Sequence, residues 1–255
     1  TGKLKAAIEA AAKAHPSLNA RIFMDETGQI MQRISDEPIR VDVIEMSDEE
    51  FRLRRENLVR PFELLGGRLY RFEFYITPSG RYWFQDVHHI ITDGVSLTIL
   101  SSDIRAAYDG SAVEMEPYTG LDLALDEADA LESDAYAQAR AYYAALLDGR
   151  DTDSLPVRDV FGKTPRQEWL TQEFTLNEEP FRSLRREAGV STGAFFTGIM
   201  GFLIAKYNYS NESVIATVYS GRSTAQTDRT FSMLVKTLPF VTDISGNPAI
   251  RDLLR

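Results

Sequence analysis

Two aromatic-rich stretches constrain the fold of this 255-residue chain more than any other feature. They are RLYRFEFYI at 68–76 and RYWFQDV at 81–87, and a short turn containing Pro-Ser-Gly joins them. Aromatic and β-branched residues favour strands, and a short turn between two such stretches favours an antiparallel pair. We therefore expect the two stretches to be paired central strands of a sheet.

Other local patterns in the first half predict two helices and a hairpin before these strands, and one helix after them. Apolar residues repeat at helical spacing up to His15-Pro16, where proline disfavours further helix: Leu4, Ala7, Ile8, Ala11 and Ala12. The stretches 19–24 and 28–34 flank the turn DETG as a hairpin. Ser47 and Glu50 form a capping box, which predicts a helix from there to near Pro61. A further helix is expected from Val95 to Tyr108.

The second half repeats this order loosely. From 109 to about 160 the chain is acidic and irregular, apart from a helical stretch at 135–147, and 148–165 has the composition of a linker. Beyond it the patterns predict a strand, two helices, the second capped by Ser191, and two more strands, at 168–176, 180–189, 191–208, 213–220 and 234–244. A last helix breaks off in 248–255, so we expect the chain to be part of a longer polypeptide.

Composition excludes several classes of function. Asp and Glu outnumber Lys and Arg by 38 to 28, and this surplus repels phosphate backbones and anionic lipids, so nucleic acid is not an expected partner. The chain has no cysteine, which removes disulfides, thiolate metal sites and a cysteine nucleophile. Apolar runs too short to span a membrane, and the lack of a signal peptide pattern, lead us to expect a cytoplasmic protein with no membrane partner.

The histidines are unevenly distributed, because two of the three are adjacent in VHHIITDGVS at 87–96. This stretch joins the second aromatic strand to the helix expected from Val95. Side chains alternate along a strand, so His88 and His89 are expected to point to opposite faces and to have different roles. The positive end of the next helix lies nearby and favours a neutral imidazole, which can accept a proton.

Each residue of this stretch also has a structural explanation. A lone histidine at a strand end is more often structural than catalytic, although two adjacent ones weaken that explanation. Asp93 is a common type of helix cap, and Gly94 can supply a turn with positive φ. A metal site is not favoured, because adjacent histidines diverge and lack the i, i+4 spacing of a zinc helix. The chain contains neither a G-x-S-x-G elbow nor a phosphate-binding G-x-x-x-x-G-K loop.

The stretch VHHIITDGVS closely resembles the His-His-x-x-x-Asp-Gly motif of condensation domains of nonribosomal peptide synthetases, which have a chloramphenicol acetyltransferase-like fold. Three more stretches are similar in the same order: 13–23, with Asn19 in place of an arginine, 60–74, and 219–240, with Lys236 in place of an asparagine. The resemblance implies an α/β fold, specifically an α+β two-layer sandwich. It implies an N-terminal lobe over 1–160, the incomplete start of a similar C-terminal lobe over 161–255, and a tunnel between them.

The resemblance also implies an acyltransferase that joins two thioesters held on carrier domains and forms a peptide bond. By match to the motif, His89 is the catalytic histidine, as a general base or as the acceptor that orients the attacking amine. His88 is a supporting residue, and Asp93 forms a structural ion pair for which Arg222 is the expected partner. Gly94 leaves room for the substrate arm, and its N–H is a candidate donor to the oxyanion. Lys236 either alters the tunnel wall or points to solvent.

The partners implied are donor and acceptor peptidyl carrier domains, which present 4′-phosphopantetheine, and an adenylation domain in the same polypeptide. The chain itself is expected to bind no cofactor and no metal, and to be inactive alone. Three alternatives stay open: an epimerisation domain, a stand-alone acyltransferase of the same fold that uses coenzyme A thioesters, and a catalytically silent module that recruits partners. The stretch Gly94-Val95-Ser96 modestly favours condensation over epimerisation, and the intact motif argues against a silent module.

Overall fold

The computed structural model describes residues 2–153, 170–249 and 252. The chain divides into two compact units, of which the first contains 1–137 and 220–235 and the second contains 138–219 and 236–255. This division differs from the expected boundary at 160, which lies outside the described residues. It also returns 220–235 to the first unit, because buried residues of that segment, such as Phe231, belong to the first unit's core.

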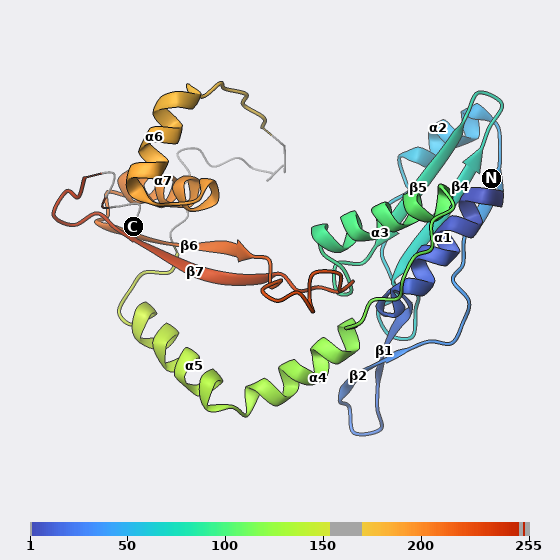
Figure 1. Ribbon diagram of the computed structural model, residues 1–255, viewed down its shortest axis with the longest axis horizontal. Helices are drawn as coiled ribbons and strands as arrows, with labels where there is room; N and C mark the ends of the chain where they lie inside the picture. Colours follow the sequence, from blue (N-terminus) through green and yellow to red (C-terminus); the bar gives the residue numbers. More distant parts are fainter. Residues whose placement is uncertain (1, 154–169, 250–251, 253–255) are drawn as a thin grey trace, which may run out of the picture. The chain divides into compact units, whose positions relative to one another are not determined.

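The first unit is built on a three-stranded sheet, with helices α1 and α3 side by side against it (Figure 1). In chain order the elements of this unit are α1 (Gly2–Ala14), the 3₁₀ helix η1 (Pro16–Asn19), β1 (Ala20–Met24), β2 (Ile30–Ile34), β3 (Asp42–Glu45), α2 (Asp48–Arg55), β4 (Tyr70–Ile76), β5 (Arg81–Val87), α3 (Gly94–Tyr108) and α4 (Gly120–Leu131). The boundary between the units falls within α5 (Asp134–Leu147).

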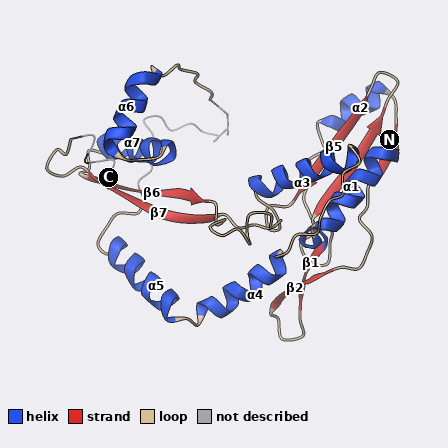
Figure 2. Ribbon diagram, in the orientation of Figure 1, coloured by secondary structure: helices blue, strands red, loops and turns tan. Residues whose placement is uncertain are grey.

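The aromatic strands pair as predicted, but only β4 is central, since β5 lies at an edge of the described sheet. The strand order is β3-β4-β5, in which β4 and β5 are antiparallel, from Tyr70 opposite Val87 to Ile76 opposite Arg81. The predicted hairpin is also present, because β1 and β2 pair from Ala20 opposite Ile34 onward. Figure 2 shows both hairpins as red arrows.

The main core lies between the helices and one face of this sheet. Alternate residues of β4 point into it, since Tyr70 and Phe72 are both members of the buried cluster. The remaining members come mostly from α1, α3 and the loops beside them: Ile8, Ala11, Ala12, Leu18, Ala20, Val41, Leu69, Ile91, Leu100 and Phe231. Burying a large apolar side chain of this kind contributes roughly 1.5–3 kcal/mol, so the cluster fixes α3 firmly against the sheet.

Three short elements differ from the sequence-based expectation. β3 was not predicted, because it has only four residues and lies at the edge of the sheet, parallel to β4. α4 lies in the stretch expected to be irregular, and it has no buried residue that would give an apolar stripe. α2 has the predicted capping box at Ser47 but ends at Arg55, well before Pro61.

The second unit contains α6 (Glu178–Ala188), α7 (Thr192–Tyr207), β6 (Glu212–Tyr219) and β7 (Lys236–Asp243). β6 and β7 are antiparallel, and α7 packs against both. Ser191 caps α7, as predicted. The strand expected at 168–176 is not formed in its described part, 170–176, where Leu170 is 95% exposed and pairs with no described strand.

Of the helices that the structure describes, none is by itself long and apolar enough to cross a membrane. α6 and α7 pass that test of length and composition only as a pair, with a bend of 90° between them.

Candidate functional site

The two adjacent histidines lie in a tight turn between β5 and α3. β5 ends at Val87, so the strand alternation expected at the next two residues does not apply. The backbone of His88 still bonds to the neighbouring strand region, because its N–H donates to the carbonyl oxygen of Leu69 at 2.8 Å. Its carbonyl accepts from the N–H of Ile91 at 3.1 Å, which closes the turn. The different environments of the two side chains therefore come from this turn.

The His88 side chain is half-buried and engaged. Its Nδ1 accepts a hydrogen bond from the backbone N–H of Ile90 at 3.0 Å, so a neutral ring carries its proton on Nε2. The ring also meets the edge of Phe62, with 5.6 Å between the centroids. The Phe62 ring in turn lies under the guanidinium of Arg71, 3.7 Å from its centroid. These contacts fit a supporting role for His88.

The His89 side chain is exposed. It makes no hydrogen bond, ion pair or ring contact within the part of the chain that the structure describes. Both ring nitrogens of His15 and the Nδ1 of His88 bond within the protein, whereas those of His89 have no partner among the described residues. Of the three histidines, His89 therefore has the least engaged ring in the described residues.

Asp93 anchors the start of α3, immediately beyond this turn. It is the N-cap of that helix and is 1% exposed. Its Oδ1 accepts from the backbone N–H of Ser96 at 2.8 Å and from the Ser96 hydroxyl at 2.9 Å. Its Oδ2 accepts from Arg222 Nη1 at 2.8 Å and from the backbone N–H of Leu234 at 3.1 Å. All these donors converge on one carboxylate.

The structure thus brings Asp93 and Arg222 together, and both side chains are almost fully buried. Arg222 Nη2 also donates to the Ser96 hydroxyl at 2.9 Å and to the carbonyl of Thr230 at 3.0 Å. Burial raises the pKa of the Asp93 carboxyl, but the bonds from Arg222 and Ser96 outweigh it and hold that pKa below its usual value. The carboxylate is therefore ionised, and Ser96 is a member of the site whose role sequence reasoning missed.

Gly94 is the first residue of α3, and the space where a side chain would begin is open. A Cβ built on it would meet no atom within 4 Å, and its φ is not positive. The turn explanation for this glycine is therefore wrong. Because the first N–H groups of a helix have no intrahelical partner, the N–H of Gly94 is left without a bonded acceptor among the described residues.

The third histidine, His15, is fully buried between two carboxylates in the same unit. Its Nδ1 lies 2.8 Å from Glu116 Oε2 and its Nε2 lies 2.8 Å from Asp103 Oδ2. Sequence reasoning placed His15 in a similar stretch but gave it no role. Both partners lie far along the chain, so no local pattern marks them.

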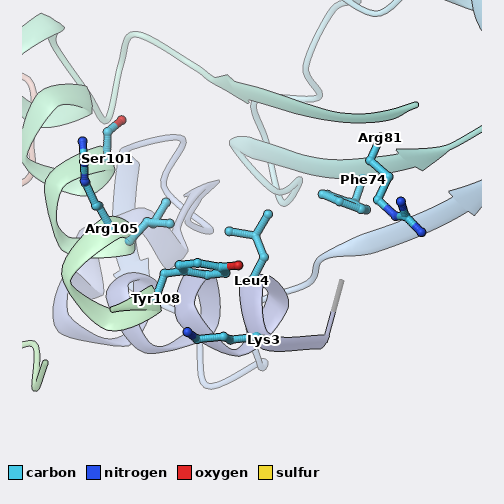
Figure 3. Close-up of a pocket in the computed structure, with 8 residues that line it drawn as sticks. Lys3, Leu4, Phe74, Arg81, Ser101, Arg105 and Tyr108 are labelled. Atoms are coloured by element: carbon cyan, nitrogen blue, oxygen red, sulfur yellow. The ribbon is translucent and has the colours of Figure 1, made fainter. Parts of the chain in front are cut away.

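A pocket of about 450 Å³ lies at the other end of α3 (Figure 3). It is lined by Lys3, Leu4, Phe74, Arg81, Ser101, Ile104, Arg105 and Tyr108. The Lys3 ammonium lies over the Tyr108 ring, 4.3 Å from its centroid. At 1.5 Å per helical residue, Tyr108 is roughly 21 Å from Gly94, and the pocket holds no histidine or carboxylate. We do not assign the chemistry of the histidine turn to this pocket.

Two further points about the site concern a metal, which was not expected, and Lys236. In the described residues there is no group of three or more His, Asp or Glu side chains that could hold a metal ion. Lys236 is the first residue of β7 in the second unit, and its side chain is exposed.

Comparisons with known proteins agree with the resemblance seen in the sequence. A family model described as Condensation domain matches residues 2–255. Tyrocidine synthase 3 of Brevibacillus parabrevis is 26% identical over 262 residues, which cover 99% of this chain and 4% of that protein. Gramicidin S synthase 2 of Aneurinibacillus migulanus is 26% identical over 242 residues, which cover 91% of this chain and 5% of that protein.

Solved structures are similar over the same length. The epimerization domain from the third module of tyrocidine synthetase B has a TM-score of 0.80 at 20% identity. The first condensation domain of the calcium-dependent antibiotic synthetase, in complex with a substrate analogue, has a TM-score of 0.73 at 18% identity. Each match covers 99% of this chain and 63% of the matched structure. The chain has the condensation-domain fold, an α/β fold, and it belongs to the condensation-domain family of nonribosomal peptide synthetases.

Proposed function

We propose that this chain supplies the catalytic histidine of an enzyme that joins two carrier-bound acyl thioesters through a peptide bond. The observation that carries the proposal is the state of His89. Its ring is exposed and unengaged, and it lies five residues before the start of α3, which the buried Asp93–Arg222 pair holds in place. The family match over 2–255 supports the reaction class.

In the proposed reaction the amine of the acceptor attacks the thioester carbonyl of the donor. A C–N bond forms, the C–S bond breaks, and one proton moves from the amine to the departing thiolate. His89 accepts that proton, or accepts a hydrogen bond that aims the amine. Because a thioester is already activated, positioning supplies much of the acceleration, and proton transfer adds on the order of 10²–10⁴-fold.

Gly94 has two proposed roles in this reaction. The open space beside its Cα admits the substrate arm, because no atom beyond its chain neighbours and its own helix backbone lies within 4 Å of the Cβ position. Its unpaired N–H, at the positive end of α3, is available to donate to the oxyanion of the tetrahedral intermediate. Asp93 contributes indirectly, by fixing the first turn of the helix that carries this N–H.

The test uses the polypeptide that carries this chain and two loaded carrier domains, the donor with an acyl thioester and the acceptor with an aminoacyl thioester. Mass spectrometry of the acceptor carrier measures product. We expect dipeptidyl thioester from the wild type and almost none from His89→Ala. Ile90→Ala is the matched control, because Ile90 is 48% exposed in the same turn. Unchanged product from His89→Ala would refute catalysis by this residue.

Epimerisation is the second candidate, because an epimerization domain has the same fold as this chain, with a TM-score of 0.80. The two activities separate when a single loaded carrier is incubated in deuterium oxide. An epimerase exchanges the α-proton of the bound aminoacyl group, whereas a condensing enzyme leaves it and needs the second carrier.

The assay of dipeptidyl thioester formation separates the remaining alternatives. A stand-alone acyltransferase would form product from a soluble coenzyme A thioester, without a donor carrier. A silent module would form no product under any of these conditions. The proposed partners, two peptidyl carrier domains and an adenylation domain, are supported by the much longer synthetases among the relatives. The proposed 4′-phosphopantetheine arm belongs to the carriers and reaches this chain as part of the substrate.

A further inference from the structure

His15 takes no direct part in the proposed reaction. His15 follows the last residue of α1 and is 0% exposed. Its ring touches α3 through Asp103, the loop after α3 through Glu116, and the 220–235 segment through the Phe231 ring, at 5.6 Å between centroids. One buried side chain therefore links parts of the first unit that are far apart in the sequence.

The geometry requires an additional proton at this place. A neutral imidazole has one N–H donor and one acceptor, but both ring nitrogens of His15 face carboxylate oxygens at 2.8 Å. Only the imidazolium can donate to two ionised carboxylates at once. If the ring is neutral, one carboxyl group must hold the proton instead. In either case the cluster of His15, Asp103 and Glu116 holds one proton more than a neutral ring with two ionised carboxylates would. Both hydrogen bonds of the ring depend on that proton.

The 229–234 segment lies between this cluster and the Asp93 pair, and its residues alternate between them. Arg229 Nη2 donates to Asp103 at 2.9 Å and the N–H of Phe231 donates to Glu116 at 2.7 Å. On the other side, the carbonyl of Thr230 accepts from Arg222, the Ser232 backbone bonds to the Ser96 hydroxyl, and the N–H of Leu234 donates to Asp93. The segment is thus bonded on both sides.

We propose that His15 is a positioning residue for His89, which acts by holding a proton that fixes the 229–234 segment. With the proton in place, Glu116 and Asp103 hold the segment, and the segment holds Asp93 and Ser96 at the start of α3. When the proton leaves, one of the two carboxylates faces an unprotonated ring nitrogen, and the segment loosens together with the turn that carries His89. This inference rests on the proposed function of His89.

The titration behaviour of the cluster agrees with this assignment. Burial alone would lower the pKa of His15, but its hydrogen bonds to Glu116 and Asp103 outweigh burial, and the pKa is raised above 6.5. Burial raises the pKa of Glu116 as well, against the lowering effect of His15 and of the Phe231 N–H. Both shifts favour keeping the proton. The charged groups that face the ring are Asp103, Glu116 and, through them, Arg229.

The first measurement needs no catalytic activity. Because the chain has only three histidines, ¹⁵N ring spectra against pH resolve the state of each. We expect both His15 nitrogens to be protonated at pH 6.5 and one of them to lose its proton only at a higher pH. Above the pH at which the proton leaves, the backbone N–H groups of Phe231, Ser232 and Leu234 should exchange about 10-fold faster, after correction for intrinsic exchange. A His15 that is singly protonated at pH 6.5, with unchanged exchange in this segment, would overturn the proposal.

The second measurement is the pH profile of dipeptidyl thioester formation by the polypeptide that carries this chain. His15→Asn keeps one amide donor toward Glu116, as the deprotonated ring does, and cannot titrate, so we expect lower turnover at every pH and loss of the alkaline decline that His15 causes. Glu116→Gln removes one negative charge, so the decline should move to lower pH. A merely structural His15 would change the amount of folded enzyme and leave the shape of the profile unchanged.

The outcomes separate this inference from the proposed function. Product from the wild type with identical pH profiles in His15→Asn would overturn the positioning role and leave the role of His89 standing. A wild-type enzyme that makes no product at any pH would overturn the proposed function, and the positioning role with it. The spectra and the exchange rates would still decide whether the proton holds the segment.

Discussion

At the scale of single residues, the three histidines show how surroundings decide what one side chain can do. His15 is fully buried between two acids, and His88 is half-buried and bonded to its own turn. His89 alone is exposed and unengaged in the described residues. The sequence motif predicted that the two adjacent histidines differ, but it gave the wrong reason, because β5 ends before both of them.

A prediction at this scale concerns Gly94. The space at its Cβ position is open, and its backbone belongs to an ordinary helix. We expect Gly94→Trp to fold with an unchanged melting temperature and to lose nearly all dipeptidyl thioester formation, since the indole would occupy the space proposed for the substrate arm. Gly94→Ala, the matched control, should retain much of the activity. Full turnover by Gly94→Trp would show that no substrate passes there.

Asp93 gives a second prediction, on stability. Asp93→Ala leaves the buried Arg222 unpaired, and such a loss costs about 3–5 kcal/mol in the free energy of unfolding. The control is Asp42→Ala, which breaks the exposed pair with Arg40 and should cost about 0–1 kcal/mol. Urea unfolding measures both values. Equal costs for the two variants would contradict a structural role for the Asp93–Arg222 pair.

We also expect the stability of the protein to depend on pH through the ionisation of the Asp93 carboxylate. The pKa of Asp93 is lowered in the folded protein, so its contribution to stability is present above the usual carboxyl value of 3.8 and is lost as the pH falls through the lower folded value. Wild-type stability should therefore decline on acidification more steeply than that of Asp93→Asn, which cannot titrate at this position. Parallel acid profiles for the two proteins would contradict the lowered pKa.

At the scale of elements, sequence reasoning succeeded where burial gives one face a clear pattern. The aromatic strands β4 and β5 and the helix α3 each bury such a face, and all three were predicted. It failed where no face is buried, as in α4, or where an alternating pattern finds no partner strand, as in 170–176. The Asp93–Arg222 pair was predicted from a resemblance, whereas Ser96 and Glu116 needed the folded chain.

Within the second unit, α7 packs closely on β7 at Gly201, and this contact is testable. A Cβ at Gly201 would overlap the Oγ1 of Thr242, which is buried. We expect Gly201→Ala to destabilise the unit by about 1–3 kcal/mol, as overpacking does. Gly193→Ala in the same helix is the control, because its nearest neighbour would be 3.9 Å away. An equal melting temperature for both variants would contradict this packing.

At the scale of the whole molecule, the division into two units does not follow the order of the chain. The expected boundary at 160 assumed that consecutive residues stay together, as in most domains. The 220–235 segment instead returns to the first unit, where it supplies Phe231 to the core and Arg222 to Asp93. No local pattern in the sequence marks that return, because it depends on contacts between residues that are far apart along the chain.

Because the 220–235 segment packs into the first unit, we expect that unit to be incomplete without it. A fragment of residues 1–137 should have low stability, because Asp93 and Glu116 lose buried donors. Adding a peptide of residues 220–235 should raise its melting temperature increasingly with peptide concentration, and the same peptide with Arg222→Gln should do so less. A fragment that is equally stable with and without the peptide would contradict the division.

The central claim is that the exposed ring of His89 takes part in forming the C–N bond. Single-turnover formation of dipeptidyl thioester, from donor and acceptor carriers already loaded, measures this step without product release. The account predicts that His89→Ala slows this step by on the order of 10²–10⁴-fold and that His89→Gln, which keeps an acceptor but not a base, falls between. A His89→Ala enzyme with the wild-type rate would contradict it.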